Sequence, residues 1–190
     1  MGGVYIKIKN DYCSDAYCTT GHICLIDSSK DDYVCKVCNT PLGLESGTIP
    51  NNSISASSFG PGREPWRGRL RMTQGSGHSG SWEPKKRKVG EYLQVDFGKI
   101  CRVTKVATQG RPNHYHRITS YSLSYALNEG TFTDYKVGGT LKVFSGNTDR
   151  DTIVTNVLPV PIRCRYIRFV VVTFFAHPAM RAEVYGCPEN

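Results

Sequence analysis

The residues best able to do chemistry in this sequence are its cysteines, its histidines and one run of basic side chains. The eight cysteines lie at positions 13, 18, 24, 35, 38, 101, 164 and 187. Cys35 and Cys38 have the C-x2-C spacing of a zinc site, and His22 could join them, but the later cysteines are isolated and supply no second pair. An even, clustered set indicates disulfides instead, which places the protein outside the cell or on its surface. We expect no metal and no cofactor.

Histidines are the candidate general bases of the chain, and they are His22, His78, His114, His116 and His177. None of them lies in a recognised motif for an activated nucleophile or a catalytic metal. The sequence therefore predicts a protein that is not an enzyme. A deep pocket with a histidine beside a carboxylate would favour an enzyme instead.

The basic run consists of Lys85, Lys86, Arg87 and Lys88, in a chain with 24 Lys and Arg against 16 Asp and Glu. In an intracellular protein such a run would suggest a nucleic-acid partner. In a disulfide-bonded extracellular protein it favours heparan sulfate, a sulfated matrix component or an anionic lipid, and no nucleic acid. The alternative is a solvated surface loop without a partner.

Period-two patterns predict the strands that must position these groups. Apolar and polar residues alternate over residues 93–97 and 121–125, and apolar runs follow at 103–107, 141–144, 153–158, 166–172 and 182–185. Glycines and prolines, 19 and 10 in number, mark turns between them. No stretch approaches the roughly 18 apolar residues of a membrane-spanning helix. Many short strands without a helical pattern predict an all-β antiparallel sandwich or barrel.

Several short segments carry a family resemblance because they follow one another in a recognisable order. They are residues 41–47, 54–59, 69–70, 93–98, 108–110, 146–148, 165–168 and 181–187. In this order they resemble the discoidin family, the coagulation factor V/VIII C-type domain. The resemblance implies an eight-stranded jelly-roll or distorted β-barrel sandwich over residues 38–187, with Cys38 bonded to Cys187. That bond would join the domain ends at one end of the barrel and leave the other end for ligands.

Residues 1–37 form a separate, disulfide-rich module in this interpretation. The spacing of their cysteines resembles the start of an EGF-like module, which implies the pairs Cys13–Cys24 and Cys18–Cys35. The pattern departs from that family at Cys38, so we interpret the module as a truncated EGF-like stub. The first residues lack an apolar secretory segment, and we expect the chain to begin inside a longer precursor.

Cys101 and Cys164 belong to neither cysteine framework. We expect them to bond to each other, because two leftover cysteines in one small extracellular domain usually meet. Two buried free thiols are the alternative. Asn51 begins an N-glycosylation sequon, Asn51-Asn52-Ser53, which predicts a glycoprotein.

The discoidin resemblance implies that three loops at the free end of the barrel hold the ligand. They correspond to residues 59–64, 74–80 and 111–116, and the side chains assigned to binding are Phe59, Arg63, His78, Arg111, His114, Tyr115 and His116. In the third loop, Arg111 could hold an anionic group through paired hydrogen bonds while Tyr115 stacks on a sugar ring. Both histidines there would add positive charge at about pH 6. The alternative is a solvated turn with Tyr115 folded back on the sheet.

Other conspicuous residues are assigned to structure. Trp66 and Trp82 align with packing positions of the family. Arginines and one glutamate in the matching segments are expected to form contacts within the sandwich: Arg69, Arg165, Arg168, Arg181 and Glu183.

Together these features predict an extracellular adhesion and recognition module, secreted or on the cell surface. Its loop end would bind an acidic glycan, a matrix protein or a cell-surface protein. The alternative is a peripheral protein that binds phosphatidylserine on anionic membranes. Because Gly, Pro, Ser and His dominate the first two loop tips, the sequence favours the first function.

Overall fold

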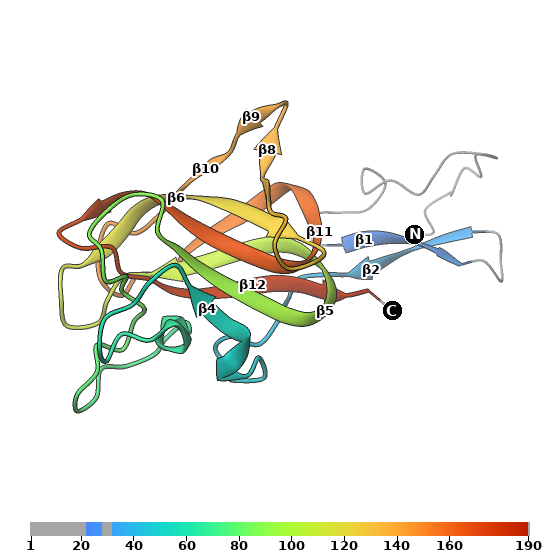
Figure 1. Cartoon of the computed structure of the whole chain (residues 1–190). Helices are drawn as coiled ribbons and strands as arrows, with labels where there is room; N and C mark the ends of the chain where they lie inside the picture. The colour runs from blue at the N-terminus through green and yellow to red at the C-terminus, as the bar shows by residue number, and fades with distance from the viewer. Residues whose placement is uncertain (1–21, 28–31, 190) are drawn as a thin grey trace.

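The computed structural model describes residues 22–27 and 32–189 as an almost purely β protein (Figure 1). A hairpin of β1 (His22–Asp27) and β2 (Asp32–Val37) comes first in the chain. Two short 3-10 turns, η2 (Asn51–Ser53) and η3 (Pro65–Gly68), lie between strands of the main sheet. No helix among the described residues is long and apolar enough to cross a membrane.

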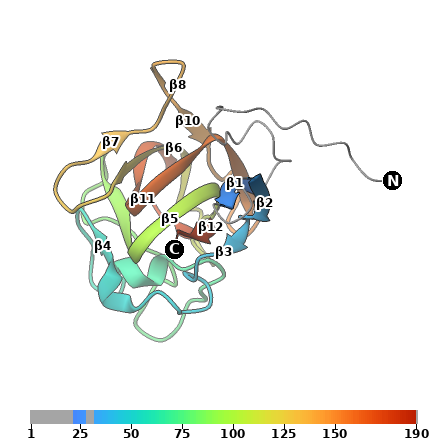
Figure 2. The same cartoon turned by 90° about the vertical axis from the view of Figure 1, so that its right-hand side faces the viewer.

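The main sheet has eight strands and curls around a single core (Figure 2). Its path runs β10-β6-β11-β5-β12-β3, while β4 pairs with β5 and β7 with β6. The strands are β3 (Thr40–Pro41), β4 (Ile54–Ala56), β5 (Tyr92–Gln109), β6 (Arg117–Ala126), β7 (Thr133–Asp134), β10 (Val143–Ser145), β11 (Val154–Phe175) and β12 (Arg181–Pro188). A small hairpin of β8 (Lys136–Val137) and β9 (Thr140–Leu141) projects from the side. The predicted all-β sandwich is confirmed.

Strands β5 and β11 are longer than the sequence suggested. The apolar runs 93–97 and 103–107 both belong to β5, and 153–158 and 166–172 both belong to β11. Pro161 does not end the strand but lies in an irregularity of β11, where the register with β5 shifts between Val157 and Ile162. Such irregularities bend a strand without ending it, and they tolerate proline. Each long strand therefore curves around the core.

The alternating residues face the core as expected. Leu93, Val95 and Leu123 are fully buried, as are Ile167 and Phe169 on β11. Burying a large apolar side chain contributes about 1.5 to 3 kcal/mol to the free energy of folding. This row of side chains, contributed by three neighbouring strands, holds the sheet together.

Both tryptophans pack, as assigned. Trp82 is fully buried, and its indole Nε1 donates to the backbone oxygen of Ser58 at 3.0 Å. Trp66 is partly buried against the core, with the guanidinium of Arg67 4.2 Å from its ring centroid. Both indoles therefore have the packing role assigned to them.

Two buried polar side chains, Arg69 and Glu183 of β12, hold residues 44–49 against the sandwich. Arg69 is buried and donates to the backbone oxygens of Leu44 and Ile49, both at 2.7 Å. Glu183, also buried, accepts the backbone N–H groups of Leu44 and Glu45. Burial lowers the pKa of Arg69, while the charge of Glu183 opposes that shift. These residues have the structural role expected of them.

Two more of the assigned arginines, Arg165 and Arg168, lie on the outer side of the sheet. Arg165 forms a two-pronged pair with Asp96, at 2.8 and 2.9 Å. Arg168 donates its Nε to Gln94 Oε1 at 2.8 Å, and its guanidinium lies over the rings of Phe132 and Tyr92, at 3.4 and 4.1 Å from their centroids. Both arginines stabilise the sheet surface.

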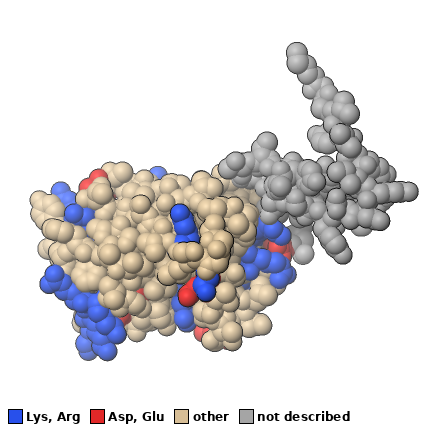
Figure 3. Space-filling view, turned by 90° about the horizontal axis from the view of Figure 1, so that it is seen from above, with Lys and Arg blue, Asp and Glu red and all other residues tan. Residues whose placement is uncertain are grey.

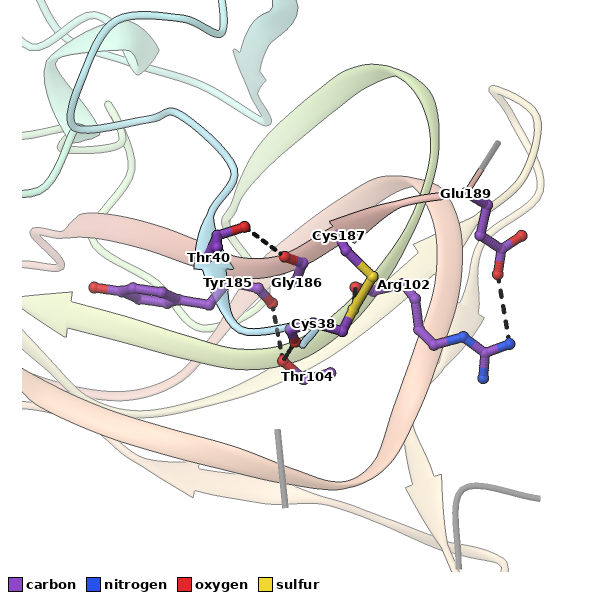
Figure 4. Close-up of a disulfide and its surroundings, with 8 residues drawn as sticks. All are labelled: Cys38, Thr40, Arg102, Thr104, Tyr185, Gly186, Cys187 and Glu189. Atoms are coloured by element: carbon purple, nitrogen blue, oxygen red, sulfur yellow. Dashed lines mark hydrogen bonds and ion pairs between the residues drawn. A yellow bond between two sulfur atoms is a disulfide. The ribbon is translucent and has the colours of Figure 1, made fainter. Parts of the chain in front are cut away.

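The disulfide expected between Cys38 and Cys187 is present (Figure 4). It joins residues 149 positions apart, with their Cα atoms 4.8 Å from each other. Thr104 donates to the backbone oxygen of Cys38 beside it. A Cβ on Gly186 would come within 2.0 Å of the Arg102 backbone oxygen, so only glycine allows β12 to approach β5 here.

The expected bond between Cys101 and Cys164 is absent, and that prediction is wrong. The two residues are direct partners in the β5–β11 ladder, but both are buried free thiols. Burial raises the pKa of Cys101 to about 11 and raises that of Cys164 further. The sequence analysis correctly predicted that the two cysteines lie close together but wrongly predicted that they are bonded. As buried thiols they act as small apolar side chains.

Some predictions lie outside what the structure describes. Cys13 and Cys18 are not among the described residues. Only the backbone of Cys24 and Cys35 is described, and there they are register partners in the β1–β2 hairpin. The pairs Cys13–Cys24 and Cys18–Cys35, the EGF-like module and the boundary at residue 37 therefore stay predictions, as does the glycan on Asn51.

Removing the Cys38–Cys187 bond should strongly destabilise the sandwich. For the double variant Cys38→Ala/Cys187→Ala we expect the free energy of unfolding to fall by about 3 to 5 kcal/mol, because a very long loop is no longer closed in the unfolded chain. Urea unfolding measures this. The control is Thr40→Ala, which removes a neighbouring hydrogen bond to Gly186 and should cost about 1 kcal/mol. Equal midpoints for parent and double variant would contradict the role assigned to the bond.

Candidate ligand-binding site

The loops at the end of the sandwich away from the disulfide form one surface (Figure 1). The first loop meets the second where Ser79 donates its backbone N–H to the Gly62 oxygen at 2.9 Å. The segment after β11 meets the segment before the basic run where the His177 ring Nε2 lies 2.8 Å from the Pro84 oxygen. Residues from four segments of the chain therefore share this end.

Glu83 lies at the centre of this end and is fully buried. Its carboxylate is 3.1 Å from Arg111 Nη1, 2.9 Å from His116 Nδ1 and 3.6 Å from Arg63 Nε. One buried acid thus joins the first loop to the third. Sequence reasoning missed Glu83, because a single glutamate beside a packing tryptophan gives no motif.

The position of Arg111 corrects the expectation that it holds a ligand. It is only 8% exposed, and Nη1 is engaged by Glu83. Its Nε has no hydrogen-bond partner among the described residues. A buried charge already paired with an acid is not available to a second anion at the surface. Arg111 therefore positions the third loop.

The histidines of the third loop differ from one another. His116 is half-buried against Glu83, whereas His114 is exposed, with the ring centroids 5.3 Å apart. The positive charge of Arg111, followed by burial and by His116, lowers the pKa of His114. His114 therefore gains its proton below the range expected from the sequence.

A histidine does lie beside a carboxylate, since His116 contacts Glu83. The same His116 nitrogen lies 3.4 Å from Arg111 Nη1. We call Glu83, Arg111 and His116 the clamp, because one buried carboxylate holds both third-loop side chains.

The second loop closes on itself. The His78 ring lies so near Gly75 that a Cβ there would come within 2.2 Å of it. Gly62 has a positive φ of 70°, and a Cβ on it would meet the Gly77 oxygen at 2.4 Å. Glycines thus permit the first two loops to touch. His78 is half-buried in this contact.

Exposed rings flank the clamp. Tyr115 is 68% exposed and not folded back on the sheet, and Phe59 is 48% exposed. Phe175, at the end of β11, is 51% exposed and was not found from the sequence, because it follows a strand pattern rather than a loop signal. The loop end therefore presents more aromatic surface than its tips suggested.

The basic run lies at this same end. Residues 85–88 are all exposed, and the backbone N–H of Lys85 donates to the Ser58 hydroxyl beside the first loop. Figure 3 shows Lys and Arg side chains gathered most densely at one corner of the loop end. The run and the predicted loops thus belong to one surface.

Arg181 supports the loops from the interior of the sandwich. Its buried guanidinium donates to the backbone oxygens of Gly110, Met72 and Arg150, and pairs with Asp151 at 2.9 Å. Burial lowers its pKa, and Asp151 opposes that shift. The loops are therefore held without regular secondary structure. Among the residues described, no group of three potential ligands could hold a metal ion.

A β-sandwich with a disulfide at one end and a braced, basic loop surface at the other defines a jelly-roll module of the discoidin type. The chain belongs to the F5/8 type C domain family, whose model matches residues 53–184. This confirms the discoidin resemblance.

Known relatives share this domain within longer proteins. The chain is 38% identical over 157 residues to human Neuropilin-2, covering 79% of this chain and 16% of that protein. It is 32% identical over 158 residues to pig Lactadherin, covering 79% and 39%. The chain therefore spans less than half the length of either relative.

Solved structures agree on the fold. Discoidin II from Dictyostelium discoideum superposes with a TM-score of 0.66 at 19% identity, covering 91% of this chain and 61% of that one. A family 32 module of Clostridium perfringens NanJ in complex with galactose has a TM-score of 0.52 at 19% identity, with 72% and 96% covered.

Removing the charge of Glu83 should loosen the loop end. For Glu83→Gln we expect a loss of about 3 kcal/mol in the free energy of unfolding, because Arg111 stays buried without its counter-ion. Urea unfolding measures the loss. The matched control is Glu45→Gln, whose partner Arg71 is exposed, and it should change stability little. A Glu83→Gln variant as stable as the control would show that the buried Glu83–Arg111 pair does not contribute to the free energy of unfolding.

His114 should titrate at a lower pH in the folded chain than in urea. Its lowered pKa means that the folded state binds fewer protons than the unfolded state near the ordinary value of about 6.5. His114 therefore reduces stability as pH falls through that range. NMR titration of the ring measures the midpoint. Glu83→Gln should lower it further, because Glu83 raises this pKa; a midpoint at or above the unfolded value would refute the assignment.

Proposed function

We propose that this chain is a non-enzymatic, extracellular adhesion and recognition module that binds an acidic glycan, free or on a matrix or cell-surface protein, through its loop end. The observation that carries the proposal is the exposed run of residues 85–88 at the same end of the sandwich as exposed Phe59, Tyr115 and Phe175. Cations bind sulfate and carboxylate groups, and aromatic rings pack against the apolar faces of sugars. One surface offers both.

The relatives support this proposal in outline. Discoidin-type domains occur in Neuropilin-2 and Lactadherin, and a structure of the same fold is known with galactose bound. The disulfide supports an oxidising location, either secreted or on the outer face of the cell. In that location a sulfated glycan is a more accessible polyanion than a nucleic acid.

An anionic membrane surface is the second candidate. The structure favours it more than the sequence did, because Phe59 and Val89 are 48% and 59% exposed beside the basic run. Apolar side chains next to cations are the combination that peripheral proteins use on anionic lipid. Polar groups nevertheless dominate the first two loop tips, so the glycan remains our proposal.

Replacing Lys85, Lys86, Arg87 and Lys88 by Ser should weaken binding to heparin and flatten its salt dependence. Log affinity should fall linearly with log salt in the parent, and each lost contact should reduce that slope by about 1. Heparin-column elution and titrations at several salt concentrations measure this.

The control for this experiment replaces Lys99 and Lys136, both exposed and outside the loop end, by Ser. It should retain most of the parent's affinity. If the slope of log affinity against log salt is unchanged in the 85–88 variant, the run is a solvated loop without a role in binding. Binding to phosphatidylserine vesicles without binding to heparin would favour the membrane candidate.

A further inference from the structure

A continuous strip of cations and rings crosses the edge of the loop end, and we call Arg150, Tyr115, Arg117 and Phe175 the rim strip. The Arg150 guanidinium lies 5.2 Å from the Tyr115 ring centroid. Arg117 Nη1 donates to the Tyr115 backbone oxygen at 2.9 Å, and its guanidinium lies 4.3 Å from the Phe175 ring centroid. Each member therefore contacts the next.

The inner end of the strip is rigidly supported. Arg117 and Phe175 are register partners in the β6–β11 ladder. Side chains on paired strands of a sheet hold their relative positions better than side chains on loops. The strip should therefore lose little freedom when it binds a ligand.

The strip leads toward the basic run. Beyond Phe175 the chain reaches His177, whose backbone N–H donates to the Phe175 oxygen at 2.8 Å. The His177 ring in turn contacts the oxygen of Pro84, directly before Lys85. Contacts thus connect the rim strip to residues 85–88 across the loop end.

The chemistry of the strip differs from that of the run. Tyr115 and Phe175 are 68% and 51% exposed, and both arginines are half-buried against them. Two acids, Asp149 and Asp151, flank Arg150 in the chain. The Asp149 carboxylate accepts the backbone N–H groups of Asp151 and Thr152 within its own turn, and Asp151 pairs with Arg181. Arg117 Nε has no hydrogen-bond partner among the described residues. The strip thus combines ring surface with two planar cations, whereas the run offers charge alone.

We propose that the rim strip is a second subsite for a linear sulfated polysaccharide, whose chain continues onto residues 85–88. A sugar ring would pack against Phe175 or Tyr115 while its sulfate or carboxylate pairs with Arg117 or Arg150. This rests on the glycan-binding function proposed above and extends it to a chain that occupies two subsites.

A membrane fits the strip less well. Apolar tips that enter lipid must be clear of charge, because a guanidinium is costly to move into hydrocarbon. Here each ring has an arginine over it. A hydrated polyanion with apolar sugar faces suits this pairing better.

The experiment compares heparin tetrasaccharide with heparin dodecasaccharide at several salt concentrations, using the whole chain. The parent should bind the longer chain more tightly, because it reaches both subsites. Phe175→Ala should weaken dodecasaccharide binding by about tenfold at every salt concentration, with the slope unchanged, because a ring rather than a charge is lost. Replacing residues 85–88 by Ser should instead change the slope.

The matched control is Leu141→Ala, an exposed apolar residue on the β8–β9 hairpin, which should bind as the parent does. Circular dichroism and thermal unfolding of each variant show that the fold is retained. Arg117→Ala provides a second test of the strip, and it should both weaken binding and reduce the slope by about 1.

The outcomes separate the two proposals. A parent that binds neither heparin fragment would contradict the proposed function itself. If the parent binds both, and Phe175→Ala and Arg117→Ala retain its affinity and its preference for the longer chain, the rim strip is not a subsite although the proposed function stands. If Phe175→Ala and Arg117→Ala lose the parent's binding to phosphatidylserine vesicles but still bind heparin as the parent does, the strip is a membrane contact and the proposal is overturned.

Discussion

A buried carboxylate governs the arrangement of the binding end. Glu83 has no exposed surface, and an anion removed from water must be paired or it destabilises the fold. Its partners come from two loops, Arg63 from the first and Arg111 and His116 from the third. Separating those loops would leave the Glu83 carboxylate unpaired, so the buried ion pairs fix the position of the two loops relative to each other. Residues around the clamp, such as Tyr115 and Phe175, are then the ones exposed for contact with a ligand.

Buried arginines perform a related task elsewhere in the sandwich. Irregular loops leave backbone oxygens without partners in a sheet, and these must find donors when they are buried. A guanidinium has five N–H groups in a planar array and can satisfy several oxygens together. Arg181 does this for three loop segments and Arg69 for the first turn of the domain. The loops therefore need no helix or strand of their own to remain in place.

Sequence patterns predicted the sheet better than the site. Strand β6 was evident because its side chains alternate between core and surface, and the Cys38–Cys187 bond followed from the family resemblance. Continuity of β5 and β11 was not evident, because alternation is local and is lost where a strand bends. The clamp was hidden for another reason: Glu83 and Arg111 are 28 residues apart, and no local pattern shows which distant charges meet. The residue type of Arg111 therefore suggested an anionic ligand, whereas its burial shows that its anionic partner is the Glu83 carboxylate.

The position of the disulfide also has a mechanical consequence. Cys38 and Cys187 are the points where the sandwich joins the chain on either side, and one covalent bond connects them with their Cα atoms 4.8 Å apart. Tension applied along the polypeptide would pass through the two sulfur atoms and bypass the strands between the two cysteines. The sandwich would then bear no load from its own backbone, and a ligand held at the far end would see the same loop geometry in a slack chain and in a stretched one.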